Sequence, residues 1–594
     1  MSIYRAGRII KPRHFKIAPL GRGRGDRVPY VVGFDSEAQD SRAFTLQFAL
    51  PGKPENETII AYVPRKEHAA LHVFMTVVHR VAIDRKREHL IYGFNLAYEF
   101  TQLFHDFNDT AKGADDFTFD YIMPDGTRYA WTVYNSKRHY AVILNTRTKL
   151  RVRFLDAHAF FSTSLDKAAR MLDIPPKLEP PLFKRSQWRT RKFREYAQRD
   201  AYITRLLGER IMTMHDEYDV RTCISAPHFA SSVFRRRFLT DEIALPNERL
   251  EQHGLYSYHG GKNGYYLDEP ADLSGIRAYD IRSAYPEAMA ELPDLTRSTW
   301  RPVVGFASAT HSVWRVTLDY DPCKYGGMQN VGGTWLGVPG RYTVHITGYE
   351  LDAMLTRHEC RIIRAVGHVL DGPPGGPLAE YVRTFYALKS TTPYETERVT
   401  AKLFLNSLYG KFFQKVPVGI VGTYVWETGE YVASDPNQEF DYVAGGLYHP
   451  PYASLITGFV RAKIHALEHR YDAIMTSTDG VFAWREPDPR DIGPSLGQLD
   501  VTTGHLRIWR ERLYLYDVGD HGVESCPGAG CKEHKSALHG FRGDPRELAG
   551  VPLTAGRYDY HAQQVVTLGM STRRYDGRYH EPGSFVTLPF ALDV

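Results

Sequence analysis

Acidic residues that could bind divalent metal ions stand at three places in the N-terminal third of the chain. Asp35 and Glu37 are two apart after an apolar run, so on a β-strand their carboxylates point to the same face. Tyr196 and Asp200 are four apart in a helical pattern and share one helix face, and Glu99 lies between the two pairs in sequence. Each pair taken alone could be a solvent-facing strand end or a charged helix surface. Together, the four acids predict one cluster built by long-range folding.

Clustered carboxylates repel one another unless cations neutralise them, so this cluster predicts bound Mg²⁺ or Mn²⁺. Two such ions can activate water and stabilise the leaving oxygen of a phosphodiester, with Tyr196 orienting the water. The order D-x-E, N-x-x-Y-E, Y-x-x-x-D resembles the exonuclease motifs of proofreading polymerases. That resemblance assigns metal binding to four acids: Asp35, Glu37, Glu99 and Asp200. It also implies DNA contacts for Asn95 and Tyr98. The family usually has aspartate where this chain has Glu99, so we expect an altered rate or metal preference.

Two further aspartates lie far apart in the later half of the chain. Asp280 in RAYDIRSAYPEAM follows an apolar run, and Asp479 in AIMTSTDGVFAW lies in a tight turn between two strand-like runs. These segments resemble motifs A and C of family B DNA polymerases. The resemblance implies that both aspartates, with the carbonyl of Ile281, bind two catalytic ions, and that Tyr285 excludes a 2′-hydroxyl. The family commonly has D-T-D in motif C, and Ser477 replaces the first aspartate here, which we expect to tune the site.

One helical stripe carries side chains suited to a nucleotide. Lys402, Asn406 and Tyr409 follow the spacing i, i+4, i+7 in TAKLFLNSLYGKFF, although an ordinary amphipathic surface has the same spacing. A lysine suits a triphosphate and a tyrosine offers a platform to a base pair. The string closely resembles motif B of protein-primed family B polymerases, and Lys389 resembles their second triphosphate-binding lysine.

Three more segments resemble DNA-contacting motifs of the same family. YSYHGG resembles the Y-x-G-G motif, whose glycines let a backbone approach DNA closely, although a plain turn has the same composition. ITGFVR resembles a template- and primer-contacting segment, and RLYLYD resembles the K-x-Y primer-terminus motif with arginine in place of lysine. The residues that these matches imply are Tyr258, Gly260, Gly261, Thr457, Arg461, Arg512 and Tyr514.

Alternating strand-like and helical stretches predict a multidomain α/β and α+β protein. The resemblance implies an RNase H-like 3′-5′ exonuclease domain followed by a right-hand polymerase with palm, fingers, thumb and two insertions. The predicted parts are a flexible basic arm (1–28), the exonuclease domain (29–225), palm with motif A (226–304), insertion 1 of the terminal-protein type (305–368), fingers with motif B (369–413), insertion 2 (414–448), palm with motif C (449–524) and thumb (525–594).

Composition excludes several classes of protein. The formal net charge is only +5, which suits an enzyme with basic tracks around acidic metal ligands. Five cysteines are far too few for a disulfide scaffold, and with no long apolar run they favour a cytoplasmic protein without a membrane anchor, in a host cell if viral. Cys526, Cys531 and His534 could hold zinc, or the cysteines are incidental in a loop.

The sequence therefore predicts a DNA-directed DNA polymerase with 3′-5′ proofreading. We expect template and primer DNA, deoxynucleotides and a terminal protein primer as partners of a monomer. Three alternatives stay open: a family B polymerase primed by nucleic acid or independent of a primer, an exonuclease with a non-catalytic DNA-binding C-terminal half, and a structural DNA-packaging protein. The last leaves both acidic sets unexplained.

Overall fold

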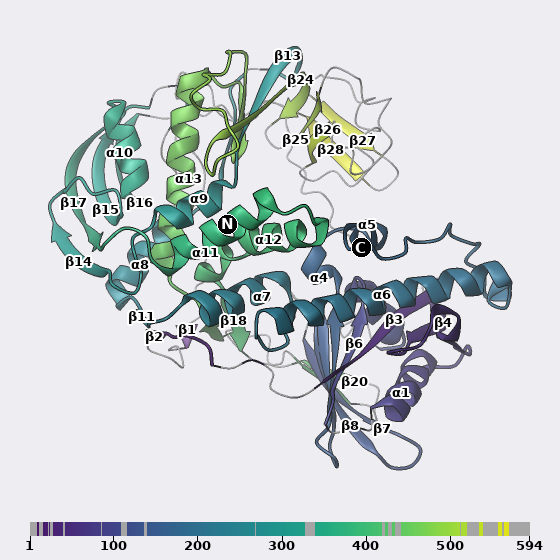
Figure 1. Ribbon diagram of the computed structural model, residues 1–594. Coiled ribbons are helices and arrows are strands. Elements are labelled where there is room, and N and C mark those ends of the chain that lie inside the picture. The colour runs from purple at the N-terminus through teal and green to yellow at the C-terminus, as the bar shows by residue number, and fades with distance from the viewer. Residues whose placement is uncertain are drawn as a thin grey trace. The chain divides into compact units, whose positions relative to one another are not determined.

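The computed structural model divides the chain into two compact units (Figure 1). Unit 1 comprises Met1–Ile243 and Arg383–Tyr448, and unit 2 comprises Ala244–Val382 and His449–Val594. The described residues lie between 9 and 568, except for gaps at 11–15, 22, 24–27, 40–41, 83, 85, 108–115, 136–138, 268, 323, 327–338, 419–421, 426–429, 434–440, 511–512, 519–533, 539–555 and 561–563.

Unit 1 is built on a ten-stranded sheet in the order β20-β19-β7-β8-β9-β10-β6-β3-β4-β5. At its centre β3 and β10 both run parallel to β6, and β4 pairs antiparallel with β3. The strands are β3 (Pro29–Gln39), β4 (Arg42–Ala49), β5 (Ile59–Tyr62), β6 (Glu88–Gly93), β7 (Phe117–Ile122), β8 (Arg128–Tyr134), β9 (Tyr140–Asn145), β10 (Arg151–Asp156), β19 (Gly422–Val425) and β20 (Glu430–Ala433).

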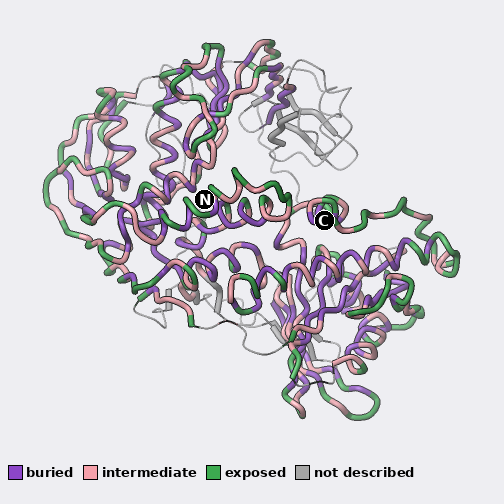
Figure 2. Tube along the Cα trace, viewed as in Figure 1, coloured by how far each residue is buried: buried purple, intermediate pink, exposed green. Residues whose placement is uncertain are grey.

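The long helix α6 (Arg191–Glu217) packs directly against β3, and buried residues recur along it (Figure 2). Glycine makes the close approach possible. A Cβ on Gly33 would lie 2.2 Å from the carbonyl oxygen of Ala201, and one on Gly208 would lie 2.5 Å from the ring of Tyr92. This packing places the face of α6 that carries Asp200 next to the strand that carries Asp35.

Aromatic rings fill the core on the sheet of unit 1. Phe34 packs edge-on against Phe74 and Phe154, with centroids 5.2 and 5.3 Å apart. All three are fully buried, and edge-to-face pairs add to the hydrophobic gain. The helices of this part are α1 (Ala69–Val81), α2 (Leu96–Leu103), α4 (His158–Phe161) and α5 (Leu165–Met171), and Ser164 caps α5 by accepting from the Lys167 amide.

Helix α12 (Glu395–Ser407), which carries motif B, belongs to unit 1 and packs against α7 (Ala226–Val233). Phe404 lies 5.0 Å from Phe229 and 4.5 Å from Phe385 of α11 (Pro377–Thr391). Below these helices a small sheet joins β18 (Lys415–Val418), β21 (Asp441–Ala444) and β1 (Ile9–Ile10). Part of the segment predicted as a flexible arm thus forms strand pairs, including β2 (Lys16–Ile17) with β11 (Ile243–Ala244).

Unit 2 is built on a seven-stranded antiparallel sheet in the order β12-β22-β23-β13-β24-β25-β26. Helix α13 (Pro450–Tyr471) and helix α9 (Ala284–Glu291) pack against each other beside it. The strands are β12 (Lys262–Tyr265), β13 (Ala271–Ile281), β22 (Met475–Thr478), β23 (Gly480–Ala483), β24 (Leu499–Arg510), β25 (Leu513–Val518) and β26 (His534–Leu538). A two-stranded hairpin of β27 (Gly556–Tyr560) and β28 (Gln564–Leu568) follows.

A second, four-stranded sheet of unit 2 overlaps the region predicted as insertion 1 (305–368), but its first strand lies before that region and its last strand runs past the end. Its order is β14-β17-β15-β16, with α8 (Glu248–Ser257) and α10 (Gly348–Thr356) packed on it. The strands are β14 (Thr299–Val304), β15 (Ser312–Tyr320), β16 (Gly340–Thr347) and β17 (Cys360–Asp371). Helix α10 begins in a capping box of Thr347 and Glu350.

The predicted multidomain α/β and α+β organisation is confirmed by this arrangement. Among the described residues, no helix combines the length and the apolar character that crossing a bilayer requires.

Candidate active sites

The acids predicted from the N-terminal third meet in one pocket of unit 1. Carboxylate oxygens of Asp35, Glu37 and Asp200 all lie within 4.8 Å of one another. The first two point the same way from β3, as the i, i+2 spacing requires, and Asp200 reaches them from α6. The pocket has a volume of about 630 Å³ and is also lined by Asn95 and Tyr98. The spacing within each pair, taken together with the resemblance to the exonuclease motifs, had predicted this convergence.

Glu99 lies beside this group, where it is held by a neighbour on β3. The Ser36 hydroxyl donates to Glu99 Oε2 over 2.6 Å, and Glu99 is only 2% exposed. Glu99 lies in the first turn of helix α2, whose N-cap Asn95 has a left-handed backbone with φ of 64°. Asp156, which the sequence analysis did not single out, fixes this turn by accepting from the Asn95 and Leu96 amides. Its sequence signal was an acid at the end of an apolar strand.

Lys177 is a second residue that the sequence analysis missed. Its Nζ lies 2.6 Å from Asp200 Oδ2 and 5.2 Å from the centre of the Tyr196 ring. Burial opposes the charge of this lysine, but the contacts with Asp200 and Tyr196 raise its pKa. Lys177 stands in a proline-rich loop with no helical or strand periodicity, so its spacing gave no signal.

Burial makes the acid pocket of unit 1 favour the binding of cations. Burial first, and then the charges of neighbouring acids, raise the pKa of Asp35 to about 8 and that of Glu37 to about 9; the main neighbour is Asp200 for Asp35 and Asp35 for Glu37. Carboxylates with raised pKa values hold protons at neutral pH unless a cation replaces them. The acids therefore gain stabilisation when divalent ions bind, and this donor set of oxygens suits Mg²⁺ or Mn²⁺.

The two distant aspartates of unit 2 are brought side by side by the seven-stranded sheet. Asp280 on β13 lies opposite Gly480 on β23, and the Ile281 amide donates to the carbonyl of Asp479 over 3.0 Å. A Cβ on Gly480 would lie 2.5 Å from Asp280 Oδ1, so only glycine leaves room for that carboxylate. The turn between β22 and β23 therefore places two acids at one end of the sheet.

Tyr514, predicted near the primer terminus, faces this pair. Burial raises the pKa of Tyr514, the charges of Asp280 and Asp479 raise it further, and a hydrogen bond with Ser477 acts the other way. Ser477 thus occupies the position of the first aspartate of a D-T-D motif and contacts the tyrosine in its place. An aspartate at position 477 would have added a third carboxylate to those of Asp280 and Asp479.

Comparison with known proteins places the fold of this chain. Residues 344–437 match the family model described as DNA polymerase type B, organellar and viral. Phi29 DNA polymerase complexed with primer-template DNA and incoming nucleotide superposes with a TM-score of 0.61 at 17% identity, over 88% of this chain and 93% of that chain. Its complex with single-stranded DNA gives 0.62 at 16% identity, over 91% and 99%. The chain has the fold of a type B DNA polymerase.

A relative in sequence is a probable DNA polymerase of Ascobolus immersus, 26% identical over 221 residues. The match covers 34% of this chain and 17% of that protein, so the chain spans less than a fifth of its curated relative. The comparisons confirm the resemblance to type B DNA polymerases that the motifs indicated.

The motif B side chains lie where α12 ends. Lys402 and Asn406 are exposed one turn apart on α12, whereas Tyr409 begins a 3-10 turn, Tyr409–Phe413, so the predicted stripe does not continue as one α-helix. Asn406 and Tyr409 line a cavity of about 600 Å³ in unit 1. Lys389 lies on α11 with its Nζ 5.4 Å from the centre of the Tyr386 ring.

Two predicted DNA contacts in unit 2 are buried instead. Arg461 is 1% exposed and Thr457 is 2% exposed on α13. Arg461 forms a two-point ion pair with Glu350 and donates to the carbonyls of His259 and Gly260. We expected Arg461 to contact DNA directly. Its guanidinium instead binds the Y-x-G-G loop, because the side chain is buried away from solvent.

The Y-x-G-G loop itself adjoins motif C. Lys262, which follows the loop, pairs with Thr478 in register, and a Cβ on Gly261 would lie 2.6 Å from Thr478 Cγ2. Nothing lies within 4 Å of a Cβ on Gly260. Gly261 therefore lets the loop pack against the turn of Asp479. This role for the glycine differs from both roles considered from the sequence, a close approach to DNA and a plain turn.

The remaining predicted residues are described only in part. Tyr285 lies in the first turn of α9, two residues after the N-cap Ser283, whose φ is 56°. Arg512, Cys526 and Cys531 lie outside the described residues, and His534 begins β26.

Proposed function

We propose that this chain is a DNA-directed DNA polymerase that also removes 3′-terminal nucleotides. The observation that carries the proposal is the pairing of Asp280 with Asp479 at one end of the seven-stranded sheet, separate in the fold from the acid pocket of Asp35, Glu37 and Asp200. Two acid sets in two units suit two reactions on the same DNA, one that builds and one that trims.

At the polymerase site, Asp280 and Asp479 would hold two Mg²⁺ ions, to which the carbonyl of Ile281 adds an oxygen. When bound, such ions lower the pKa of the primer hydroxyl and neutralise the triphosphate. Tyr285 would close the space beside C2′ of the sugar, so that a ribonucleotide clashes. Tyr514, held between Ser477 and the two acids, would position the primer terminus.

Helix α12 would supply the nucleotide contacts. Lys402 and Lys389 would bind phosphates as point charges, while Asn406 and Tyr409 would contact the nucleotide and the base pair that it forms.

At the trimming site, Asp35, Glu37, Asp200 and Glu99 would hold the ions. Lys177 would keep Asp200 oriented, and Tyr196 would orient the water that attacks the phosphodiester. Asn95 and Tyr98, which line the pocket, would hold the single strand.

The test separates the two reactions by variants. Asp479→Ala should abolish primer extension with Mg²⁺ and leave degradation of single-stranded DNA, whereas Asp35→Ala with Glu37→Ala should do the reverse. A protein with an inert C-terminal half would show no extension at all. Loss of both activities in either variant would count against two sites.

We further propose protein-primed initiation by a monomer, because the motif B string and a four-stranded sheet in the place of insertion 1 support it. Addition of one deoxynucleotide to a hydroxyl of a candidate terminal protein, measured beside extension of a DNA primer, tests this step. Extension of the DNA primer alone would favour ordinary nucleic-acid priming.

A further inference from the structure

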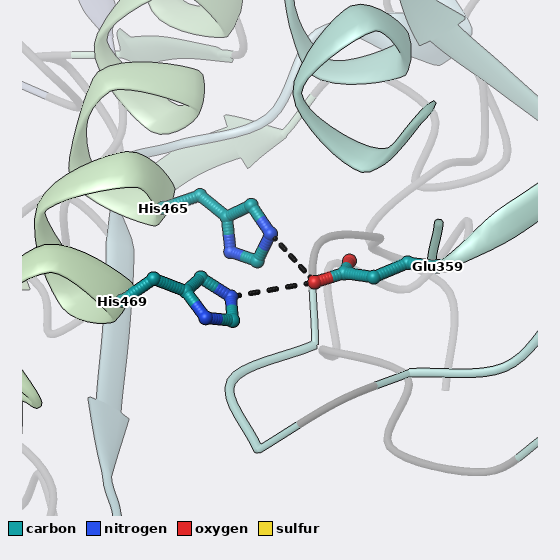
Figure 3. A group of neighbouring side chains, drawn as sticks. All are labelled: Glu359, His465 and His469. Carbon is teal, nitrogen blue, oxygen red and sulfur yellow. Dashed lines mark hydrogen bonds and ion pairs between the residues drawn. The ribbon is translucent and has the colours of Figure 1, made fainter. Parts of the chain in front are cut away.

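A cluster of two histidines and one glutamate lies in unit 2, outside both acid sets. His465 and His469 are one turn apart on α13, and Glu359 precedes β17. The Nε2 atoms of His465 and His469 lie 3.0 and 3.3 Å from the same oxygen, Oε1 of Glu359 (Figure 3). The two rings stand at 89° to each other with centroids 4.7 Å apart. Three potential metal ligands thus converge on one point.

The spacing of these atoms suits a tetrahedral ion. Zinc binds imidazole nitrogen and carboxylate oxygen at about 2.0–2.2 Å, which puts neighbouring ligand atoms roughly 3.3–3.5 Å apart around a tetrahedron. The distances of 3.0 and 3.3 Å to Glu359 Oε1 come close to that edge. Small outward movements of the side chains would admit the ion. Mg²⁺ prefers an octahedron of oxygens, so this donor set favours zinc.

The charges around the cluster favour a cation. Glu359 and Glu468 are 1% and 0% exposed, and Glu468 forms an ion pair with the buried ammonium of Lys262. The three N–H groups of Lys262 have acceptors in Glu468 and in the carbonyls of Tyr325 and Gly326, at 3.1 and 2.8 Å for the two carbonyls. With neutral imidazoles, these buried groups carry one net negative charge, which a proton or a metal ion must offset.

Further contacts of His465 and the partial exposure of His469 suit these two side chains to act as metal ligands. Nδ1 of His465 lies 3.1 Å from Lys262 Nζ and 3.4 Å from Glu468 Oε2. Because Lys262 has three other acceptors, Nδ1 of His465 can donate to the Glu468 carboxylate, as a metal-bound imidazole does. His469 is the one ligand of the three with partial exposure, at 18%, and provides a route of entry.

We propose that Glu359, His465 and His469 bind a structural zinc ion, with water in the fourth position. The ion fastens the C-terminal half of α13 to the beginning of β17, that is, to the four-stranded sheet. Because α13 leads through three residues into β22, the clamp holds the strand that ends in the motif C turn. This site depends on neither the polymerase nor the exonuclease assignment.

The test uses the full chain carrying Asp35→Ala, Glu37→Ala and Asp479→Ala, so that neither of the two acid sets keeps all its carboxylates for binding the probe. Co²⁺ is added to metal-free protein and visible absorption is followed, because four-coordinate Co²⁺ with nitrogen ligands absorbs far more strongly than six-coordinate Co²⁺. We expect one equivalent of Co²⁺ to bind with intense absorption bands, and we expect Zn²⁺ to displace it. His469→Gln and Glu359→Gln should each abolish these bands. His358→Asn is the matched control, since His358 is exposed next to Glu359 and its φ of 60° suits asparagine.

X-ray absorption at the zinc edge on the same background protein needs no change at the site and covers the case in which a variant fails to fold. Imidazole scattering from two ligands supports the proposal. Absence of a stoichiometric ion, or Co²⁺ bands that survive His469→Gln, overturns it and leaves a hydrogen-bonded network of these side chains without a metal. A bound zinc whose chelation leaves hydrogen exchange in α13 and β17 unchanged overturns the clamp.

Discussion

Replacing Arg461 separates two roles for this residue, a DNA contact and an internal tie between helices. Both guanidinium nitrogens that face Glu350 are within 2.7 and 3.0 Å of its carboxylate oxygens, and the two side chains are 1% and 5% exposed. Burial opposes ionisation of Glu350, but Arg461 keeps its pKa below the usual value. Arg461 and Glu350 thus form an ion pair that is buried away from solvent.

The magnitude follows from that burial. Removing one partner of a buried ion pair costs about 3–5 kcal/mol, because the other charge stays behind unpaired. Arg461→Met should therefore lose about this much stability around α10 and α13. Adding Glu350→Gln should restore part of it, since glutamine keeps the capping box of α10. The surface pair of Arg490 with Asp488 is the matched control: Arg490 is 84% exposed, and Arg490→Gln should change stability by less than about 1 kcal/mol.

Two assays read the two roles independently. Hydrogen exchange of α10 and α13 amides measures the loss of local stability. The slope of DNA affinity against salt measures phosphate contacts, and each contact contributes about 0.9 to that slope in logarithmic units. We expect strongly reduced protection and an unchanged slope in Arg461→Met. A slope reduced by about one contact with normal protection would refute the reasoning and return Arg461 to the DNA.

Three further results are expected. Gly261→Ala should lower primer extension but spare degradation, because the new Cβ pushes Thr478 and the motif C turn at a cost of about 1–3 kcal/mol, and Gly260→Ala, whose Cβ meets nothing, should leave both activities intact. Lys177→Met should slow single-strand degradation roughly tenfold or more in a time course, because its carboxylate partner loses orientation, while extension continues. Burial lowers the pKa of His449 to about 3. The unfolded state, in which the pKa of a histidine is about 6.5, therefore binds a proton at a higher pH than the folded state does. The stability present above pH 6.5 is lost as the pH falls toward 3, and the loss is on the order of 2–3 kcal/mol at pH 4.5. His449→Phe should lack this pH dependence of the free energy of unfolding.

The sequence predicted the acids of both sites well because their positions follow simple periodicities. Asp35 and Glu37 share a face since strand side chains alternate, and the long helix carrying Asp200 has an unbroken 3.6-residue pattern. The pairing of Asp280 with Asp479 required the family resemblance, because no local rule links residues that meet through a sheet.

Residues whose role depends on a distant partner could not be predicted in this way. Lys177 comes from a loop without periodicity, and its meaning appears only when Asp200 lies beside it. Arg461 was predicted to contact DNA because ITGFVR resembles a template- and primer-contacting segment. Its burial depends on Glu350, which lies 111 residues earlier in the chain.

The contacts around α13 connect the loop before β12, the four-stranded sheet and motif C in one network. Arg461 binds the carbonyls of the Y-x-G-G loop, Lys262 of the next strand meets Glu468 two turns along, and Thr476 of β22 donates to the same glutamate. Each tie is buried, so its loss leaves an uncompensated charge or donor instead of a solvated one. Changes anywhere along this helix should therefore reach the turn of Asp479, even where they touch neither DNA nor nucleotide. The proposed zinc clamp acts on the same helix at its far end, which is why its removal is expected to alter exchange in α13 before it alters synthesis.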